Sequence, residues 1–149
     1  MGCDIHSRAE RKVDGQWQVI AGAEPFDWRS YGMFAFLANV RNYSGIKPLS
    51  EPRGLPADSP AERDDEYLGD HSYSWLSLDE LIAFDYDAMT EDRRVTVQTG
   101  PNSWNGAHTA KPGSGEAMTY RAFLGEAFFE EIEKLKAVGA ERIVFGFDS

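Results

Sequence analysis

The feature that most constrains the fold is an alternation of apolar and polar residues near the start of the chain, closed by a tight-turn dipeptide. Over residues 3–13, Ile5 and Ala9 lie on one face of an extended segment and charged side chains lie on the other. Asp14-Gly15 follows directly, and this pair tolerates the positive φ angles that a type I′ turn needs. Residues 16–20 return as the partner strand, so the chain is predicted to begin as a β-hairpin.

Capping residues and apolar spacing predict the helices. Ser30, Ser77 and Thr119 each stand in front of a segment with helical spacing, as N-cap residues do. The helices expected on this basis, together with one short acidic helix, cover residues 31–40, 61–68, 78–84 and 120–138. The segments expected as further strands cover residues 71–76, 94–99 and 142–147.

Proline and glycine interrupt these patterns in two stretches, residues 42–60 and 100–118, which we expect to be long loops. The predicted strands and helices follow one another without a regular βαβ repeat, so the expected fold class is α+β. The chain has 149 residues, the length of one domain, and we expect a single domain over residues 1–149. In this domain the N-terminal hairpin and the C-terminal strands form a small mixed or antiparallel sheet, which packs against about three to four helices.

Charge is concentrated in one segment. The formal net charge is −10, and residues 58–92 hold twelve acidic residues and one basic residue, so this segment alone carries −11. The rest of the chain, with fourteen basic and thirteen acidic residues, is close to neutral. A long nucleic acid requires a basic surface, so this composition argues against a general nucleic-acid binder. The acidic segment is either a solvated surface or a docking surface for a basic partner protein, including mimicry of nucleic-acid charge.

The composition also favours a reducing compartment. Cys3 is the single cysteine, so no internal disulfide can form, and we expect a buried, inert thiol. Polar residues begin at Asp4, where a secretory signal would have an apolar stretch. A membrane-spanning helix needs about 18 consecutive apolar residues, and no such run is present. These features predict a cytoplasmic protein that does not cross a membrane.

A first candidate site lies in the N-terminal strand. Asp4 and His6 are two residues apart, so they project from one face of the strand about 7 Å apart at the backbone. This spacing suits two metal ligands, or a carboxylate that orients a catalytic imidazole. Asp148 follows the last apolar strand and adds a second carboxylate at a strand end. The alternatives are an exposed polar strand face without a function and, for Asp148, a solvated terminus.

A second candidate site lies in the extended segment that begins at His71. Alternation places His71 on one face with two aromatic residues, and Ser72 and Ser74 on the other face. A histidine among hydroxyl groups can bind a ligand or transfer a proton. The alternative is a half-buried histidine whose hydrogen bonds are satisfied within the protein.

Three arginines lie outside regular helix faces and are candidate ligand-binding residues: Arg29, Arg41 and Arg53. The planar guanidinium fork suits phosphate or carboxylate groups. In an acidic protein the alternative is that each arginine pairs with a carboxylate of the chain itself. No P-loop, dinucleotide-binding glycine pattern, C-x-x-C or H-E-x-x-H motif accompanies them.

Several stretches resemble a family of small bacteriophage and prophage proteins of unknown function. They are the opening Met1-Gly2-Cys3-Asp4-Ile5-His6, the segments 29–31, 34–42, 50–56 and 71–76, and the closing residues 142–148. The resemblance implies a phage or prophage origin and the cytoplasm of an infected or lysogenic bacterium, but it supplies no activity. It also implies a shared polar set, namely Asp4, His6, Arg29, Arg41, Arg53, His71 and Asp148. Related sequences often carry histidine at the position of Tyr73, so a metal site using that second histidine would lack a ligand here.

Two functions from different classes follow from these residues. The leading hypothesis is a phage-encoded protein that binds, and in its stronger form hydrolyses, a phosphate-bearing small molecule such as a nucleotide. The competing hypothesis is a non-enzymatic inhibitor whose acidic segment docks on a basic host protein. Convergence of Asp4, His6, His71 and an arginine in one pocket favours the first hypothesis, whereas scattering of these residues favours the second. The first hypothesis assigns His6, His71 and Asp4 to catalysis, and Arg29, Arg41, Arg53, Ser72 and Ser74 to ligand binding. A divalent metal is an open alternative, with Asp4, His6 and Asp148 as its ligands, and the sequence does not identify a cofactor. The oligomeric state is not indicated.

Overall fold

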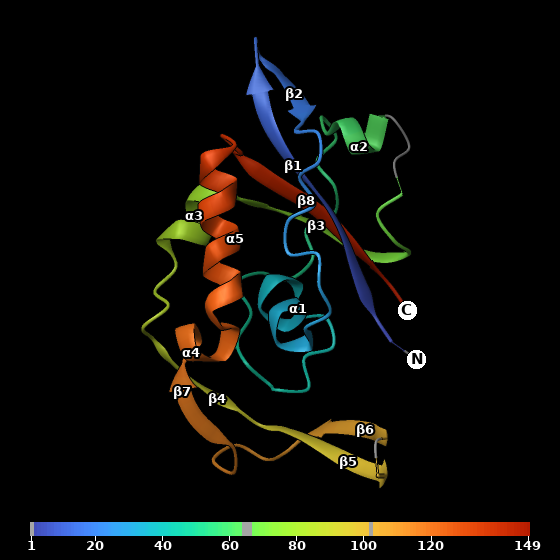
Figure 1. Ribbon diagram of the computed structural model, residues 1–149, viewed down its shortest axis with the longest axis vertical. Coiled ribbons are helices and arrows are strands. Elements are labelled where there is room, and N and C mark those ends of the chain that lie inside the picture. The colour runs from blue at the N-terminus through green and yellow to red at the C-terminus, as the bar shows by residue number, and fades with distance from the viewer. Residues whose placement is uncertain (1, 64–66, 102) are drawn as a thin grey trace. The chain divides into compact units, whose positions relative to one another are not determined.

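The structure is a computed structural model that describes residues 2–63, 67–101 and 103–149 (Figure 1). It combines helices with antiparallel sheets, so the predicted α+β class is confirmed. Internal contacts divide the chain into two compact units. Unit 1 consists of Met1–Arg29, Pro52–Phe84 and Glu126–Ser149, and unit 2 consists of Ser30–Glu51 and Asp85–Gly125. The two units interleave along the chain, which is why no linker marks them in the sequence, and the single domain over residues 1–149 stays a prediction.

Unit 1 is built on a four-stranded sheet with the strand order β2-β1-β8-β3. The strands are β1 (Asp4–Val13), β2 (Gln16–Val19), β3 (His71–Ser77) and β8 (Arg142–Asp148), and each neighbouring pair is antiparallel. Asp14 and Gly15 both have positive φ angles, 52° and 80°, so the predicted hairpin turn is confirmed. Figure 1 shows the first and last strands side by side, with the two chain ends at the same end of the sheet.

One face of this sheet belongs to the main core of unit 1. The register pairs Ile5 with Phe147 and Ala9 with Ile143, and all four side chains are buried. Helix α5 (Glu126–Ala137) buries its own apolar positions, and its Phe128 ring stacks on Phe26 with the ring centroids 4.9 Å apart. Helix α3 (Leu78–Ala83) begins with the predicted capping box. The thiol of Cys3 is buried as expected.

The other face of the sheet is covered by a smaller cluster and by a buried ion pair. Val144 packs with Ala61, which belongs to helix α2 (Pro60–Arg63), and with Leu68. At the hairpin end, the fully buried Glu10 accepts a hydrogen bond of 2.7 Å from Arg142. Other parts of unit 1 therefore cover both faces of this sheet. The polar side chains of its strands are exposed to solvent mainly at the strand ends.

Unit 2 contains one buried helix and two two-stranded sheets. Helix α1 (Tyr31–Ala38) has Ser30 as its N-cap and ends at Asn39, which has a φ of 56°. Strand β4 (Met89–Asp92) pairs with β7 (Glu116–Thr119), and β5 (Arg94–Gly100) pairs with β6 (Ser103–Thr109). Helix α4 (Tyr120–Leu124) follows β7 directly. Phe36 is the aromatic centre of this unit, because the rings of Tyr86 and Tyr120 both lie 5.8 Å from it.

Two sequence predictions about regular structure were wrong. The stretch 100–118 is not a loop, because β6 and β7 lie within it and find their partners in β5 and β4. The predicted helix over residues 120–138 is interrupted at Gly125, whose φ of 83° ends α4 before α5 begins. The stretch 42–60 has no helix or strand before Pro60, as predicted.

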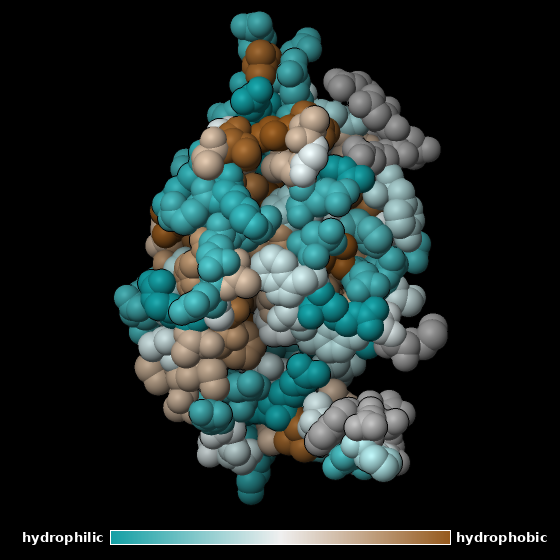
Figure 2. Space-filling model, in the orientation of Figure 1, coloured by the Kyte–Doolittle hydropathy of each residue, from teal (hydrophilic) through white to brown (hydrophobic). Residues whose placement is uncertain are grey.

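No helix among the described residues is long and apolar enough to cross a membrane. The large hydrophobic residues that are exposed come from separate elements, and Figure 2 shows hydrophilic side chains between small hydrophobic groups on the visible face.

The net charge is divided unequally between the two units. Unit 1 has nine basic and nineteen acidic residues, so it carries the whole formal charge of −10. Unit 2 has six of each and is neutral.

Candidate functional site

The register of β1 and β8 assembles the candidate site at the end of the sheet where the chain begins and ends. Asp4 pairs with Asp148 and His6 pairs with Gly146, so the side chains of Asp4, His6 and Asp148 share one face. The Nε2 atom of His6 lies 2.6 Å from Oδ2 of Asp148, and each side chain is about one third exposed, 31% and 32%. The prediction that these three residues lie together is therefore met by the strand pairing.

Arg29 completes one side of this site. Its Nε and Nη2 atoms donate two parallel hydrogen bonds to the carboxylate of Asp4, each 2.9 Å long. The Arg29 guanidinium and, to a smaller extent, His6 hold the pKa of the Asp4 carboxyl below its usual value. Asp4 is therefore ionised over a wide pH range. The Arg29 cation and the Asp4 anion lie together at this end of the sheet.

Tyr67 completes the other side. The edge of its ring meets the His6 ring with the centroids 5.1 Å apart, and Tyr67 itself is 58% exposed. Partial desolvation and the carboxylates of Asp70 and Asp148 raise the pKa of the Tyr67 phenol, so the hydroxyl stays protonated. We call His6, Asp148, Asp4, Arg29 and Tyr67 the His6 site.

Two glycines allow the segment that carries Tyr67 to cross the end of β8. A Cβ atom on Gly146 would collide with the backbone carbonyl of Leu68, and one on Gly69 would collide with the backbone of Phe147. The N–H of Asp70 then donates to the carbonyl of Phe147 at 2.7 Å. Sequence reasoning missed Tyr67, because no local pattern connects residue 67 with a glycine in the last strand.

The geometry of His6 is compatible with proton transfer. A carboxylate accepts hydrogen bonds only, so the bond to Asp148 places the proton of neutral His6 on Nε2. Nδ1 then carries the lone pair, and it has no hydrogen-bond partner among the described residues. A carboxylate that orients an imidazole in this way also stabilises the imidazolium that forms when the ring takes up a proton. The arrangement is that of a general base.

The predicted metal set of Asp4, His6 and Asp148 is engaged in ion pairs. In the part of the chain that the structure describes, no group of three or more His, Cys, Asp or Glu side chains is arranged to hold a metal ion. Asp4 is bound by both nitrogens of the Arg29 fork, and Asp148 is bound by His6. Of the residues that were to share a metal, Asp4 is paired with Arg29, and His6 and Asp148 are hydrogen-bonded to each other.

His71 does not join His6. It pairs with Phe147 across the strands, whereas His6 pairs with Gly146, and neighbouring residues of one strand point to opposite faces. The two ring nitrogens of His71 lie 2.9 and 3.0 Å from the hydroxyls of Ser72 and Ser149. The structure therefore does not bring His71 together with His6, and both ring nitrogens of His71 have hydroxyl partners within the protein, as the alternative expected; a catalytic role of His71 stays a prediction.

Arg53, Ser72 and Ser74 do not form a ligand site with His6 either. Arg53 donates two hydrogen bonds of 2.8 and 2.6 Å to Glu80, and the guanidinium lies over the Trp75 ring. Ser74 is fully buried and accepts the backbone N–H of Arg53 at 3.0 Å, so it fixes the loop rather than a ligand. Ser72 is tied to His71 and has a φ of 56°, which reflects the irregular pairing of β3 at this point.

Arg41 belongs to unit 2, where its guanidinium lies 5.5 Å from the ring centroid of Tyr31. Within the described part of unit 1, Arg29 is the predicted ligand-binding arginine that contacts the site around His6.

Several acidic side chains of the segment 58–92 have partners within the protein. It is divided between unit 1 and unit 2 after Phe84. Asp64, Asp65 and Glu66 lie outside the described residues. Six of the other acids have internal partners. Asp58 pairs with Arg142, Glu80 with Arg53, and Asp87 with Arg121. Backbone N–H groups donate to the other three, those of Gly113 and Gly115 to Glu91, that of Asp87 to Asp85, and that of Arg94 to Asp92.

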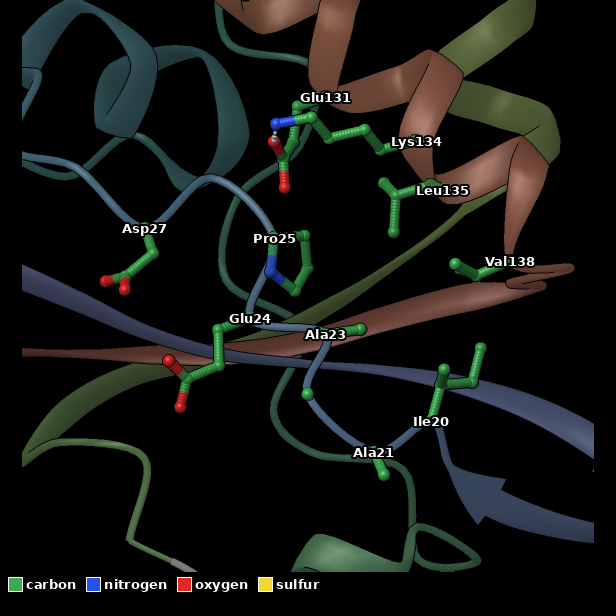
Figure 3. A pocket seen from close by; sticks show the side chains of 11 residues that line it. Ile20, Ala21, Ala23, Glu24, Pro25, Asp27, Glu131, Lys134, Leu135 and Val138 are labelled. Carbon is green, nitrogen blue, oxygen red and sulfur yellow. Dashed lines mark ion pairs between the residues drawn. The ribbon is translucent and has the colours of Figure 1, made fainter.

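A surface hollow of about 480 Å³ lies elsewhere in unit 1 and shares no residue with the His6 site (Figure 3). Ile20, Leu135 and Val138 form its apolar part. Its polar part has three carboxylates, Glu24, Asp27 and Glu131, and one ammonium group, Lys134. This excess of negative charge disfavours a phosphorylated ligand in the hollow.

Comparison with known proteins adds no further constraint, since no protein-family model, curated protein or solved structure matches the chain.

Proposed function

We propose that the protein binds a phosphate-bearing small molecule, such as a nucleotide, at the His6 site and hydrolyses it with His6 as the general base. The observation that carries this proposal is the 2.6 Å hydrogen bond between His6 and Asp148 at a partly exposed end of the sheet. Arg29 supports it as the cation beside this pair, 2.9 Å from Asp4. Asp4, His6, Asp148 and Arg29 lie together, whereas His71, which the hypothesis also assigned to this site, lies on the opposite face of the sheet.

Each residue of the His6 site has its own role in the proposed hydrolysis. Nδ1 of His6 takes a proton from a water molecule as the water oxygen attacks phosphorus, and the P–O bond to the leaving group breaks. The imidazolium then returns the proton to the leaving oxygen, while Asp148 holds the ring through Nε2–H. Arg29 and the protonated Tyr67 hydroxyl are the donors closest to the phosphate oxygens.

The charges of the site predict weak affinity. Arg29 offsets the charge of Asp4, but the carboxylate of Asp148 opposes an incoming phosphate. We therefore expect dissociation constants of about a millimolar, equivalent to about 4 kcal/mol of binding free energy. Ligands with additional groups that contact the surrounding surface bind more tightly than inorganic phosphate.

Two measurements on the full chain test the proposal. Thermal shift with a panel of nucleotides, with and without divalent metals, detects binding, because a ligand that binds only the folded state raises its stability. Release of inorganic phosphate from the stabilising nucleotide detects hydrolysis. His6→Gln is expected to reduce release at least about 100-fold, since general base catalysis contributes this much.

His71→Gln is the matched control, because it removes the other histidine of the same sheet from the opposite face. It should change phosphate release by less than about threefold. The proposal is contradicted if no nucleotide stabilises the protein at concentrations far above a millimolar, or if the two variants lose activity equally.

The charge of unit 1 favours a second candidate function, docking of a basic host protein. Unit 1 carries the whole formal charge of −10, and a surface of this kind attracts a basic partner over long distances. Binding would weaken strongly between low and high salt. Reversal of Asp64, Asp65 and Glu66 to lysine tests it: a host protein that stays bound to this variant would remove the charge argument.

A further inference from the structure

The surface hollow of unit 1 has an apolar side and an acidic side. Figure 3 shows Ile20, Leu135 and Val138 together on one side of it, and Glu24 and Asp27 on the other. Its volume of about 480 Å³ lies within the range of about 300–1,000 Å³ that is common for small-molecule sites. A ligand that fits both sides has an apolar body and a positively charged end.

Helix α5 forms one wall of the hollow. Glu131, Leu135 and Val138 are spaced by four and three residues, so they lie along one face of the helix. Val138 follows the last residue of α5, and its N–H still donates to the carbonyl of Lys134 at 3.1 Å, so the helical spacing extends to it. Leu135 is buried, whereas Val138 is 41% exposed and presents an apolar side chain at the rim.

The segment after β2 forms the opposite wall and is held to β1. The N–H of Ile20 donates to the carbonyl of Ala9 at 2.9 Å, and the N–H of Ala9 donates to the carbonyl of Ala23 at 3.3 Å. The hydroxyl of Ser7 donates to the carbonyl of Pro25. Small residues of this wall leave the space of the hollow open: Ala21, Gly22 and Ala23. The hollow is therefore formed before a ligand arrives.

Glu131 is the least hydrated carboxylate of the hollow, and its contacts are long. Its side chain is 18% exposed, compared with 55% for Glu24. Oε2 lies 3.8 Å from Nζ of Lys134, a side chain that is itself 75% exposed, and Oε1 accepts the N–H of Phe26 at 3.4 Å. A carboxylate that has lost much of its water gains free energy from a closer charged donor.

The carboxylates on the acidic side strengthen this preference for a cation. Glu24 lies 3.4 Å from Nη1 of Arg8, and the exposed Asp27 forms no ion pair with any residue that the structure describes. Arg11 lies at the apolar side instead, where its Nη1 is 3.9 Å from the Cβ position of Gly139. The positive charge missing from the acidic side is therefore one that a ligand can supply.

We propose that this hollow binds a small organic ammonium ion with an apolar body, such as an arylalkylamine. The ammonium group donates to Glu131 in place of the distant ammonium of Lys134. The apolar body packs on Ile20, Leu135 and Val138. This site goes beyond the proposed function, because it takes a ligand of the opposite charge and shares no residue with the His6 site.

Titration of the ¹⁵N-labelled full chain with 2-phenylethylammonium at pH 7, up to about 50 mM at constant ionic strength, tests the proposal. The backbone amides of residues 20–24 and 131–138 should shift along a saturable curve with a dissociation constant of about 1–10 mM. The uncharged 2-phenylethanol should bind at least about fivefold more weakly, because it lacks the charge. Methylammonium lacks the apolar body and should give no saturable shift.

Glu131→Gln should weaken the binding of 2-phenylethylammonium at least about fivefold, since the amide still accepts the N–H of Phe26 but has no charge. Glu133→Gln is the matched control. It makes the same change two residues away in the same helix, at a side chain that is 70% exposed and pairs with Lys136. It should alter the affinity by less than about twofold, because exposed charges outside the hollow are screened.

Lys134→Gln should change the affinity in the opposite direction. It removes the ammonium that competes for Glu131, so 2-phenylethylammonium should bind at least about threefold more tightly. Lys136→Gln makes the same change of charge beside Glu133 and should alter the affinity by less than about twofold. This pair decides the proposal even if Glu131→Gln does not fold. His6→Gln should leave the shifts unchanged, which separates this site from the His6 site.

Four results would overturn the proposal. The first is the absence of saturable shifts at residues 20–24 and 131–138 in the wild-type chain. The second is binding of 2-phenylethanol as tight as that of the amine. The third is tighter binding of 3-phenylpropionate, which would mean that Lys134 selects an anion. The fourth is an equal effect of the variants within each matched pair, which would mean that only the general charge of unit 1 attracts the amine.

Discussion

At the residue scale, carboxylate contacts decide which polar side chains are available for chemistry. Asp148 binds Nε2 of His6, so Nδ1 of His6 can contact a substrate. Both ring nitrogens of His71, in contrast, are hydrogen-bonded to the hydroxyl groups of Ser72 and Ser149. Arg53 is likewise bound on both arms by Glu80. Two histidines and several arginines with similar sequence surroundings therefore have different chemical roles.

The pair of Arg53 and Glu80 makes a testable contribution to stability. The hydrogen bonds from Arg53, and secondarily the backbone N–H of Ser77, lower the pKa of the Glu80 carboxyl. A carboxyl whose pKa is lower in the folded state stabilises the fold above its unfolded pKa of about 4.3, and this stabilisation is lost as the pH falls through the folded pKa. The two side chains are 28% and 26% exposed, so we expect a contribution of roughly 1 kcal/mol.

Arg53→Gln measures this contribution. The free energy of unfolding in urea should fall by about 1 kcal/mol at pH 6, and the difference from wild type should shrink below about pH 4. What remains at low pH reports contacts of Arg53 that do not depend on Glu80, which include the cation–π contact with the Trp75 ring and the hydrogen bond to the Trp75 carbonyl. A difference that is constant from pH 3 to pH 6 would show that the carboxylate contributes nothing.

At the scale of elements, the predictions that rest on short-range sequence signals are confirmed, whereas the long-range pairing of strands was not predicted. The alternation of residues 3–13, the Asp14-Gly15 turn and the Ser77 capping box each act within a few residues, and each is confirmed. Strand β7 depends on β4, which pairs Met89 with Thr119, and no local pattern identifies such a partner.

The same distinction applies to the site. Asp4, His6 and Asp148 could be chosen because polar residues near strand ends form a recognisable pattern, and Arg29 could be chosen because it lies outside regular helix faces. The separation of His71 from His6 could not be predicted, since it depends on the register of β3 and β1 on either side of β8. Tyr67 was not predictable because the glycines that admit its segment are far apart in sequence.

The crossing at Gly146 gives a prediction at this scale. In Gly146→Ala the new methyl group would meet the backbone carbonyl of Leu68, which cannot rotate away as a side chain would. The segment carrying Tyr67 must move, and we expect a loss of about 2–3 kcal/mol in the free energy of unfolding.

Gly22→Ala is the comparison, because a Cβ atom at residue 22 would meet no atom within 4 Å. The loss of stability in this variant comes only from the backbone strain of an alanine at a φ of 76°. We expect about 1 kcal/mol for this variant. Equal losses in the two variants, measured by urea unfolding, would contradict the close contact between residue 146 and Leu68.

At the scale of the whole molecule, the charge of unit 1 predicts the response to salt. Its nineteen acidic residues face only nine basic ones, so like charges repel one another in the folded state. Salt at about 0.5 M screens this repulsion and should raise the melting temperature by a few degrees. Differential scanning calorimetry checks this, and a melting temperature that falls with sodium chloride would show that ion pairs outweigh the repulsion.

The central claim is that His6, oriented by Asp148, meets a phosphate-bearing ligand, and the imidazole nitrogens report on it most directly. Long-range ¹H–¹⁵N spectra of the full chain should show neutral His6 with its proton on Nε2, and titration with a nucleotide that stabilises the protein should shift the Nδ1 resonance of His6 but not the nitrogens of His71. Asp148→Asn should abolish the fixed tautomer, because an amide can donate as well as accept. A His6 proton on Nδ1 in the wild-type chain, or a nucleotide titration that leaves the His6 nitrogens unchanged, would contradict the account.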